Sequence, residues 1–292
     1  MPELNRAIWL AAWLLGLCLT AGPAAATPPL WIARSARSTV IIFGSVHVLP
    51  AGLAWQSGAL NGAVARADEL WFELPIDAVT DSEASRLARA RGLLPLGDRL
   101  TDHLTADQSR RLEQVAKGLK LPMAALEPMR PWLAEVTISL MVDAQNGGLV
   151  SQGVEQRIQQ SAPPATRRRA LETPAQQIGF LAGASMADQI ASLDETLTEV
   201  EDAPQTYRRL VDEWMAADLA GLQADALAPA LRAAPGSYRR LITDRNRRWT
   251  RIIRRRLRSR GTVVIIVGVA HLVGPGGVPA LLRADGVAVE GP

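Results

Sequence analysis

Short apolar runs rich in β-branched residues stand near both ends of the chain, and helical periodicity fills the middle. Between about residues 30 and 75 the runs are LWIARS, TVIIFGSV and ELWFELP, and between 261 and 292 they are TVVIIVGV and VAVE. Runs of this length, bounded by turn residues, are typical of buried strands. TVVIIVGV is apolar on both faces, which indicates a central strand covered by helices on each side.

From about residue 82 to 258, apolar positions recur at helical spacing. Thr105 stands where it can cap one helix, Pro131 stands in the first turn of another, and residues 56–67 predict a shorter helix between two strands. We therefore predict an α/β fold of the α+β kind. One central sheet is built from the N- and C-terminal segments, and a large helical middle region packs over it, within a single domain of residues 27–292.

The N-terminus has the pattern of a secretory signal over residues 1–26. Arg6 precedes the apolar run AIWLAAWLLGLCLTA, and Ala24 and Ala26 occupy the small-residue positions before Thr27. The run is short for a membrane span, so we expect cleavage and no remaining span; an uncleaved anchor is the alternative. Cleavage would remove Cys18, the one cysteine, which excludes disulfides, thiolate ligands and a cysteine nucleophile from the mature chain. These features favour a secreted or periplasmic protein.

The positive charge of the chain does not indicate a nucleic-acid partner. The formal net charge is +3, and Lys117 and Lys120 are the only lysines. The densest arginine run, over residues 251–260, precedes a predicted strand, so we expect it to form the solvated last turns of a helix.

The same phrase occurs at the ends of two predicted strands, GSVH at residues 44–47 and GVAH at residues 268–271. Each copy places a histidine three residues after a glycine, and Gly44 and Gly268 allow a sharp turn or a close approach of the backbone. In sheets covered by helices, ligands bind at the carboxyl ends of the strands. We therefore expect His47 and His271 to meet at one edge of the sheet.

A third predicted strand, ELWFELP, brings a carboxylate towards the same edge. A carboxylate in an apolar strand is costly unless it is paired or bound to metal, and this points to Glu73, whereas Glu69 is expected to face solvent. Two histidines and one glutamate form a ligand set of catalytic divalent metals. The alternative is that both histidines only satisfy buried polar groups at strand ends. We expect His103 to be a surface or capping residue, and Ser45 to support the site as a hydrogen-bond donor rather than to act as a nucleophile.

Beyond these patterns, the sequence resembles the TraB/GumN family, which is related to the Tiki metalloproteases. The resemblance is carried by GSVH, GVAH, the WFELP glutamate, MRPWLAE, GVEQRI, LETPAQQ and DRNRRW, and it covers nearly the whole mature chain. It implies a sheet with a large helical region, like that of ChaN-like and erythromycin-esterase-like (EreA) proteins. It also implies a peptidase dependent on manganese, cobalt or a zinc-like divalent metal.

The resemblance also implies roles for particular residues. His47, Glu73 and His271 would be the metal and catalytic residues, and Arg245 and Asn246 would support a substrate carbonyl or orient the ligands. Glu155 and Glu172 match further acidic positions, although each could instead cap a helix, and Trp132 and Trp249 are expected to serve packing. The implied function is an exported hydrolase acting on a peptide or protein. The alternatives are an envelope protein that binds peptide, haem or metal without turnover, and a metal-free esterase.

Overall fold

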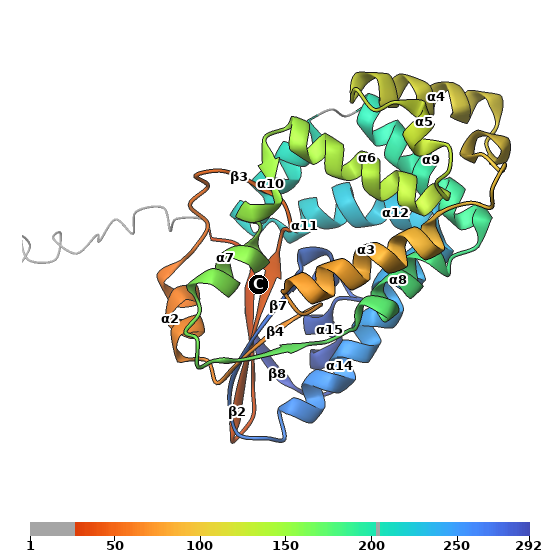
Figure 1. Cartoon of the computed structure of the whole chain (residues 1–292). Coiled ribbons are helices and arrows are strands. Elements are labelled where there is room, and N and C mark those ends of the chain that lie inside the picture. Colours follow the sequence, from red (N-terminus) through yellow and green to blue (C-terminus); the bar gives the residue numbers. More distant parts are fainter. Residues whose placement is uncertain (1–26, 203–204) are drawn as a thin grey trace, which may run out of the picture.

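The structure is a computed structural model that describes residues 27–202 and 205–292 (Figure 1). The predicted signal over residues 1–26 therefore lies outside the described residues. Within the described part of the chain, no helix is long and apolar enough to cross a membrane.

One six-stranded sheet contains strands from both ends of the chain, as the sequence predicts. Its order is β6-β4-β7-β2-β1-β8. Strands β2, β7, β4 and β6 are parallel neighbours, whereas β1 is antiparallel to both β2 and β8. The strands are β1 (Leu30–Arg34), β2 (Ser38–Ser45), β4 (Glu69–Phe72), β6 (Arg167–Ala170), β7 (Gly261–Gly268) and β8 (Ala288–Glu290). Strand β6 is the one the sequence did not predict, because its residues, RRRA, are polar and lie at an edge.

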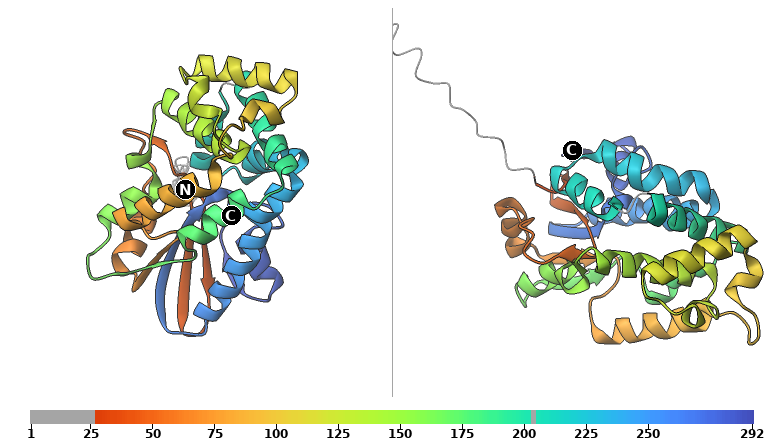
Figure 2. Two further views of the ribbon diagram at one scale, coloured as in Figure 1. Left: turned by 45° about the vertical axis from the view of Figure 1, so that its right-hand side comes forward. Right: turned by 90° about the horizontal axis from the view of Figure 1, so that it is seen from above.

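Helices cover both faces of the sheet and extend beyond its carboxyl edge as a separate helical part (Figures 1 and 2). Residues 78–182 contain α3 (Ala78–Gly92), α4 (Ala106–Gly118), α5 (Met123–Leu126), α6 (Pro131–Gln145), α7 (Val154–Ser161) and α8 (Pro174–Ala182). Residues 186–256 contain α9 (Met186–Asp202), α10 (Thr206–Ala216), α11 (Leu219–Leu222), α12 (Ala228–Ala233), α13 (Pro235–Tyr238) and α14 (Asp244–Arg256). Helices α2 (Gly58–Arg66) and α15 (Val278–Ala284) lie within the two sheet-forming segments.

Shorter elements connect these helices. They are the 3₁₀ turns η1 (Leu100–His103), η2 (Val150–Gln152) and η5 (Val269–His271), and the π-helical turns η3 (Gln223–Leu227) and η4 (Arg239–Thr243). A small second sheet pairs β3 (Leu49–Pro50) with β5 (Gly148–Leu149).

Successive side chains of the central strands point to opposite faces of the sheet, and both faces are covered by helices, so the strands are apolar on both faces. In β2, Ile41 and Phe43 pack into a core with α2, α7 and α10, whereas Val40 and Ile42 pack into a second core with α14 and α15. A third apolar cluster joins α4, α5, α6 and α9 in the helical part. The sheet is thus fixed from both sides, and its carboxyl edge faces the helical part.

Local sequence signals set several helix boundaries. The hydroxyl of Thr105 accepts a hydrogen bond from the Gln108 amide in a capping box that begins α4, and Pro131 is the first residue of α6. The arginine run was predicted as a solvated helix end, which is wrong for Arg256. This side chain is buried and donates to Ser38 Oγ at 3.0 Å and to the Arg260 carbonyl at 3.0 Å, which ties α14 to the start of β2.

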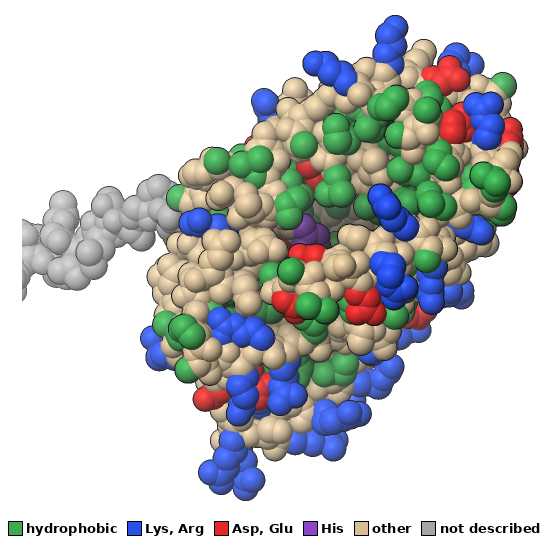
Figure 3. All heavy atoms as spheres, in the orientation of Figure 1, with side chains coloured by type: hydrophobic (Ala, Val, Ile, Leu, Met, Phe, Trp, Pro, Cys, Tyr) green, Lys and Arg blue, Asp and Glu red, His purple; other side chains and the backbone are tan. Residues whose placement is uncertain are grey.

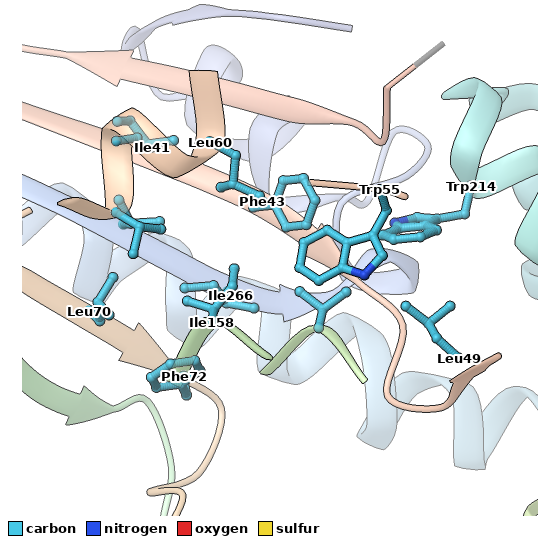
Figure 4. Packing of buried hydrophobic residues seen from close by; sticks show 14 of the residues in the cluster. Ile41, Phe43, Leu49, Trp55, Leu60, Leu70, Phe72, Ile158, Trp214 and Ile266 are labelled. Carbon is cyan, nitrogen blue, oxygen red and sulfur yellow. The ribbon is translucent and has the colours of Figure 1, made fainter. Parts of the chain in front are cut away.

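An aromatic cluster fixes the end of β2, which carries the first GxxH motif. Phe43 stacks on Trp55 with ring centroids 5.8 Å apart, and Trp214 of α10 lies 6.0 Å from Trp55 (Figure 4). The indole Nε1 of Trp214 donates to the Gly44 carbonyl at 2.8 Å. The last residues of β2 are therefore held both by packing and by a buried hydrogen bond.

Helix α7 approaches the turn after β2 so closely that no side chain fits between them. A Cβ on Gly153 would lie 2.0 Å from the His47 carbonyl oxygen, which is backbone and cannot rotate away. We expect Gly153→Ala to lower the free energy of unfolding by about 2 kcal/mol through overpacking. Gly58→Ala, where a Cβ meets open space at the start of α2, is the matched control and should be neutral or slightly stabilising. Equal urea midpoints for both variants and the wild type would contradict the close packing of α7 against the turn after β2.

Candidate active site

The two GxxH motifs end neighbouring parallel strands. Strands β2 and β7 pair in register from Ser38 opposite Gly261 to Ser45 opposite Gly268. His47 follows β2 by two residues, and His271 ends η5, the turn after β7. Glu73 follows β4, the neighbour of β7 on its other side. The carboxyl edge thus brings together the three residues that the sequence singles out.

Gly268 lies at the point around which these three side chains gather. A Cβ at Gly268 would lie 3.3 Å from Glu73 Oε1, 3.6 Å from His47 Nε2 and 3.7 Å from His271 Cδ2. The Gly268 amide itself donates to Glu73 Oε1 at 2.7 Å. The absence of a side chain here leaves the space that the three groups share. Gly44 has a different role: a Cβ there would lie 2.9 Å from Val269 Cγ2, so this glycine lets η5 pack on β2.

Arg245 of α14 connects the buried groups. Its Nη2 donates to Glu73 Oε2, and its Nε and Nη2 donate to Glu172 at 2.9 and 3.0 Å. Its Nη1 faces His271 Nε2 at 3.0 Å and also donates to the Leu241 carbonyl in η4 at 3.1 Å. The guanidinium therefore compensates two buried carboxylates at once, and all of its donors are aimed by them and by the π-helical turn that precedes α14.

His271 is buried, and its ring is held in one tautomer. Its Nδ1 lies 2.7 Å from Asn246 Oδ1, and the amide nitrogen of Asn246 donates to the Gly276 carbonyl at 2.8 Å. Because that second bond fixes the amide orientation, Oδ1 must accept, and His271 Nδ1 carries the proton. Nε2 is left as the acceptor that faces Arg245 and the shared space. Trp249 packs on the same ring, with centroids 4.4 Å apart.

His47 is anchored by Glu155, the second residue of α7. Its Nδ1 lies 2.8 Å from Glu155 Oε1, and Ser45 Oγ donates to the same oxygen. The imidazole side chain is 64% exposed, whereas His271 is 4% exposed. The two copies of one motif thus supply one solvent-facing and one buried histidine.

The charges of the site follow from these contacts. The negative charge of Glu155 and its hydrogen bond to Nδ1 raise the pKa of His47 to about 9. Burial lowers the pKa of His271 to about 3, more than Glu73 can offset. Burial alone would raise the pKa of Glu73, but Arg245 and the histidines lower it to about 2. At neutral pH the site therefore holds a cationic His47, a neutral His271 and an ionised Glu73.

We expect Glu155→Gln to lower the pKa of His47 by about one unit or more, because the main cause of its elevation is removed. The ring signals of His47, followed by NMR between pH 5 and 10 in chelator-treated protein, measure this directly. The raised folded-state pKa also means that this ion pair stabilises the wild type fully below about pH 6.5 and stops doing so as pH rises through about 9. A His47 that titrates near 6.5 in the wild type, or is unchanged in the variant, would contradict the assignment.

Among the other residues considered from the sequence, Glu69 lies in a different environment from the one predicted. Glu69 was predicted to face solvent, which is wrong: it is 6% exposed, accepts from Trp71 Nε1 at 2.8 Å and pairs with Arg167 and Arg169 of β6. Its alternation with Trp71 and Glu73 placed it on the same face of β4 and could have revealed this. His103 is half-buried at the end of η1 and contacts Asp98 at 2.9 Å, well separated in the fold from the shared space.

Two aromatic residues of the site were missed or assigned another role. Trp249 was expected to serve packing alone, but its Nε1 also donates to Glu172 Oε1 at 2.9 Å, and the Arg245 guanidinium lies 4.8 Å from its ring centroid. Phe180 of α8 lies on the same guanidinium, 5.7 Å from its ring centroid. Glu172 immediately precedes Thr173, whose hydroxyl caps α8, so Glu172 faces Arg245 rather than capping that helix.

The donors of the site are of the kinds that divalent metals bind. His47 and His271 each have Nδ1 engaged by an oxygen, which is the usual support for a histidine that ligates through Nε2. As they stand, however, no three His, Cys, Asp or Glu side chains among the described residues converge closely enough to hold an ion. Arg245 engages both Glu73 and His271 Nε2, so the site fits a metal in donor type and would require this guanidinium to move.

A charged, partly buried centre of His, Glu and Arg at the carboxyl edge of a parallel sheet is typical of ligand-binding and catalytic sites. Comparison of the sequence with family models shows which family the chain belongs to. The chain belongs to the TraB/PrgY/gumN family, whose sequence model matches residues 29–291. No curated protein matches the chain, and no solved structure does.

Proposed function

We propose that this protein is an exported hydrolase that cleaves peptide bonds at the site formed by His47, Glu73 and His271, with a divalent metal ion as cofactor. The observation that carries the proposal is the gathering of these three groups around Gly268, each held by its own buried or anchored partner. Catalysis requires side chains that are held in a fixed orientation, whereas side chains that only pack at strand ends do not require it.

The residues that would hold the ion are His47 and His271 through Nε2, and Glu73 through its carboxylate. A divalent ion bound there would supply a Lewis acid and acidify a water molecule. Glu155 and Asn246 fix the two rings with Nε2 towards the shared space, and the Gly268 amide holds Glu73 against its strand.

Arg245 has a second use once it is displaced from His271. Its guanidinium, still held by Glu172, lies beside the shared space and can donate to the oxygen of a substrate carbonyl as negative charge develops. Glu172 and Trp249 therefore act as positioning residues, because they aim the guanidinium without reaching the shared space themselves.

Export rests on the N-terminal sequence pattern, with its charged start, apolar run and small residues before Thr27. A chain that loses its one cysteine with this segment suits an oxidising compartment. The localisation of an epitope-tagged full-length chain, followed with its N-terminal sequence after purification, tests this part of the proposal.

The enzymatic part is tested with the purified full-length chain and a library of internally quenched peptides. The assay is run after chelation and after addition of Mn²⁺, Co²⁺ or Zn²⁺. Cleavage that requires an ion supports the proposal. Cleavage that is insensitive to chelation would favour metal-free acid–base catalysis by the same residues, and tight peptide binding without cleavage would favour a capture protein.

A further inference from the structure

A groove in the helical part begins beside the candidate active site. Its volume is about 800 Å³, within the range of about 300–1,000 Å³ that ligand sites occupy. Its walls come from α4, α6, α9 and α10. Apart from α10, which also packs on β2 through Trp214, these helices belong to the helical part beyond the sheet.

The groove touches the strand segment that follows His47. Tyr207, in its wall, donates from Oη to the Val48 carbonyl at 3.2 Å. A Cβ at Gly148 would lie 2.8 Å from that hydroxyl and 2.9 Å from the carbonyl of Asp143, another wall residue. Since Gly148 pairs with Pro50 in the small sheet, Tyr207 and Asp143 form the end of the groove nearest His47.

Exposed apolar side chains lie beside the small sheet and on α6. Leu149 and Val150, next to Gly148, are 48% and 57% exposed, and Leu140 of α6 is 47% exposed. Figure 3 shows a histidine side chain in a hollow on this face, with hydrophobic side chains gathered over the helical half above it. An extended chain leaving the site can therefore meet the exposed side chains of Leu149 and Val150, next to Gly148 at the end of the groove.

The charged residues of the groove wall are all acidic. They are Asp143, Glu199 and Glu201, and the described wall contains no Lys, Arg or His. Glu201 pairs with Arg111 outside the wall, at 3.1 Å. Within the described residues, the carboxylate of Asp143 has no hydrogen bond or ion pair, although it is half-buried and within reach of the charge of His47. Burial raises the pKa of Asp143 to about 6 in spite of His47, so a further cation brought by a ligand would stabilise its charged form.

We propose that this groove binds the part of the substrate that flanks the cleaved bond, and that it selects segments in which apolar residues alternate with lysine or arginine. The apolar stem of such a side chain would pack on Val142, Val200 and Leu210, and its charged end would meet Asp143 or Glu199. The inference rests on the proposed function for the cleavage itself, but the groove and its charge are independent of it.

The test is binding of three labelled peptides to the full-length chain, measured by fluorescence anisotropy. The peptides share one apolar sequence and carry two lysines, two norleucines or two glutamates at the same positions. We expect the lysine peptide to bind about tenfold more tightly than the glutamate peptide, with the difference shrinking as salt rises. The paired variant Asp143→Asn/Glu199→Gln should remove most of that difference.

A matched control changes the same charge elsewhere. Asp81→Asn/Glu83→Gln replaces two exposed carboxylates of α3, outside the groove wall, and should keep the preference of the wild type. Equal binding of the three peptides, binding of none, or an unchanged preference in the Asp143/Glu199 variant overturns the inference. Cleavage without a charge preference would support the proposed function and show that this inference is wrong. Charge-selective binding without cleavage would support this inference and contradict the proposed function.

Discussion

Replacing either histidine of the GxxH pair should abolish nearly all of the proposed peptide cleavage while the fold survives. We expect His47→Ala and His271→Ala each to lower kcat/KM by about 10³-fold, the middle of the range that a positioned catalytic side chain contributes. Both residues reach the same space at Gly268, so neither can replace the other. Glu73→Gln should have a loss of similar size, because it removes the negative charge that Gly268 and Arg245 hold there.

The third histidine offers a control within the same chain. His103 pairs with Asp98 at the end of η1 and contacts none of the site residues, so His103→Ala should retain turnover within about twofold, as expected of a replacement away from the site. Circular dichroism and urea midpoints show whether each variant is folded. Turnover that survives loss of His271 in a folded protein would contradict the placement of the site.

The largest effect on stability is expected from Arg245→Met. The substitution leaves Glu73 and Glu172 buried without their shared counter-charge, which should lower the free energy of unfolding by about 3–5 kcal/mol at pH 7. In the wild type, the low pKa of Glu73 stabilises the fold above about pH 4.5, and this is lost as pH falls towards 2. Without Arg245, burial would raise the pKa of both carboxyls, so the variant should regain stability as pH falls from 7 to 5.

Arg254, on the same helix, provides the comparison. It pairs with Asp285 at 3.0 Å, and both side chains are well exposed, so Arg254→Met should cost less than about 1 kcal/mol. Urea unfolding of both variants at pH 7 and pH 5 distinguishes them. A loss for Arg245→Met no larger than that for Arg254→Met would mean that the buried ion pairs do not hold the site together.

The sheet and the meeting of the two motifs could be predicted because both depend on strong local signals. β-branched runs apolar on both faces predict central parallel strands, and parallel strands bring their carboxyl ends to one edge. The helical middle was likewise readable from Thr105, Pro131 and the periodicity. Strand β6 was missed because RRRA has neither apolar character nor alternation, and the ion pairs of Arg167 and Arg169 with Glu69 of β4 join residues about 100 positions apart in the chain.

The different environments of His47 and His271 could not be predicted from the repeated GxxH motif. His271 is buried because η5 turns it towards α14, where Asn246, Trp249 and Arg245 enclose it. His47 remains exposed although Ser45 before it and Val48 and Leu49 after it are buried. These differences come from residues about 25 and 110 positions away in the chain, Arg245, Asn246 and Glu155, which no local pattern connects to the motif.

The role of Arg245 also lies beyond sequence patterns. Its family-like position suggested a place near the site, but not that it joins Glu73, Glu172 and His271 at once. The π-helical turn η4 before α14 places the Leu241 carbonyl against this guanidinium, and nothing in the letters RRLIT indicates such a turn.

The most direct test of the account is whether His47 and His271 act as one unit. The measurement is kcat/KM for peptide cleavage by the wild type, His47→Ala, His271→Ala and the double variant under identical conditions. If the two motifs build one site, the double variant retains about the same residual activity as either single variant, because the first substitution already disables the unit. If the two losses instead multiply, each histidine contributes separately, and the claim that the repeated phrase builds one shared site is wrong.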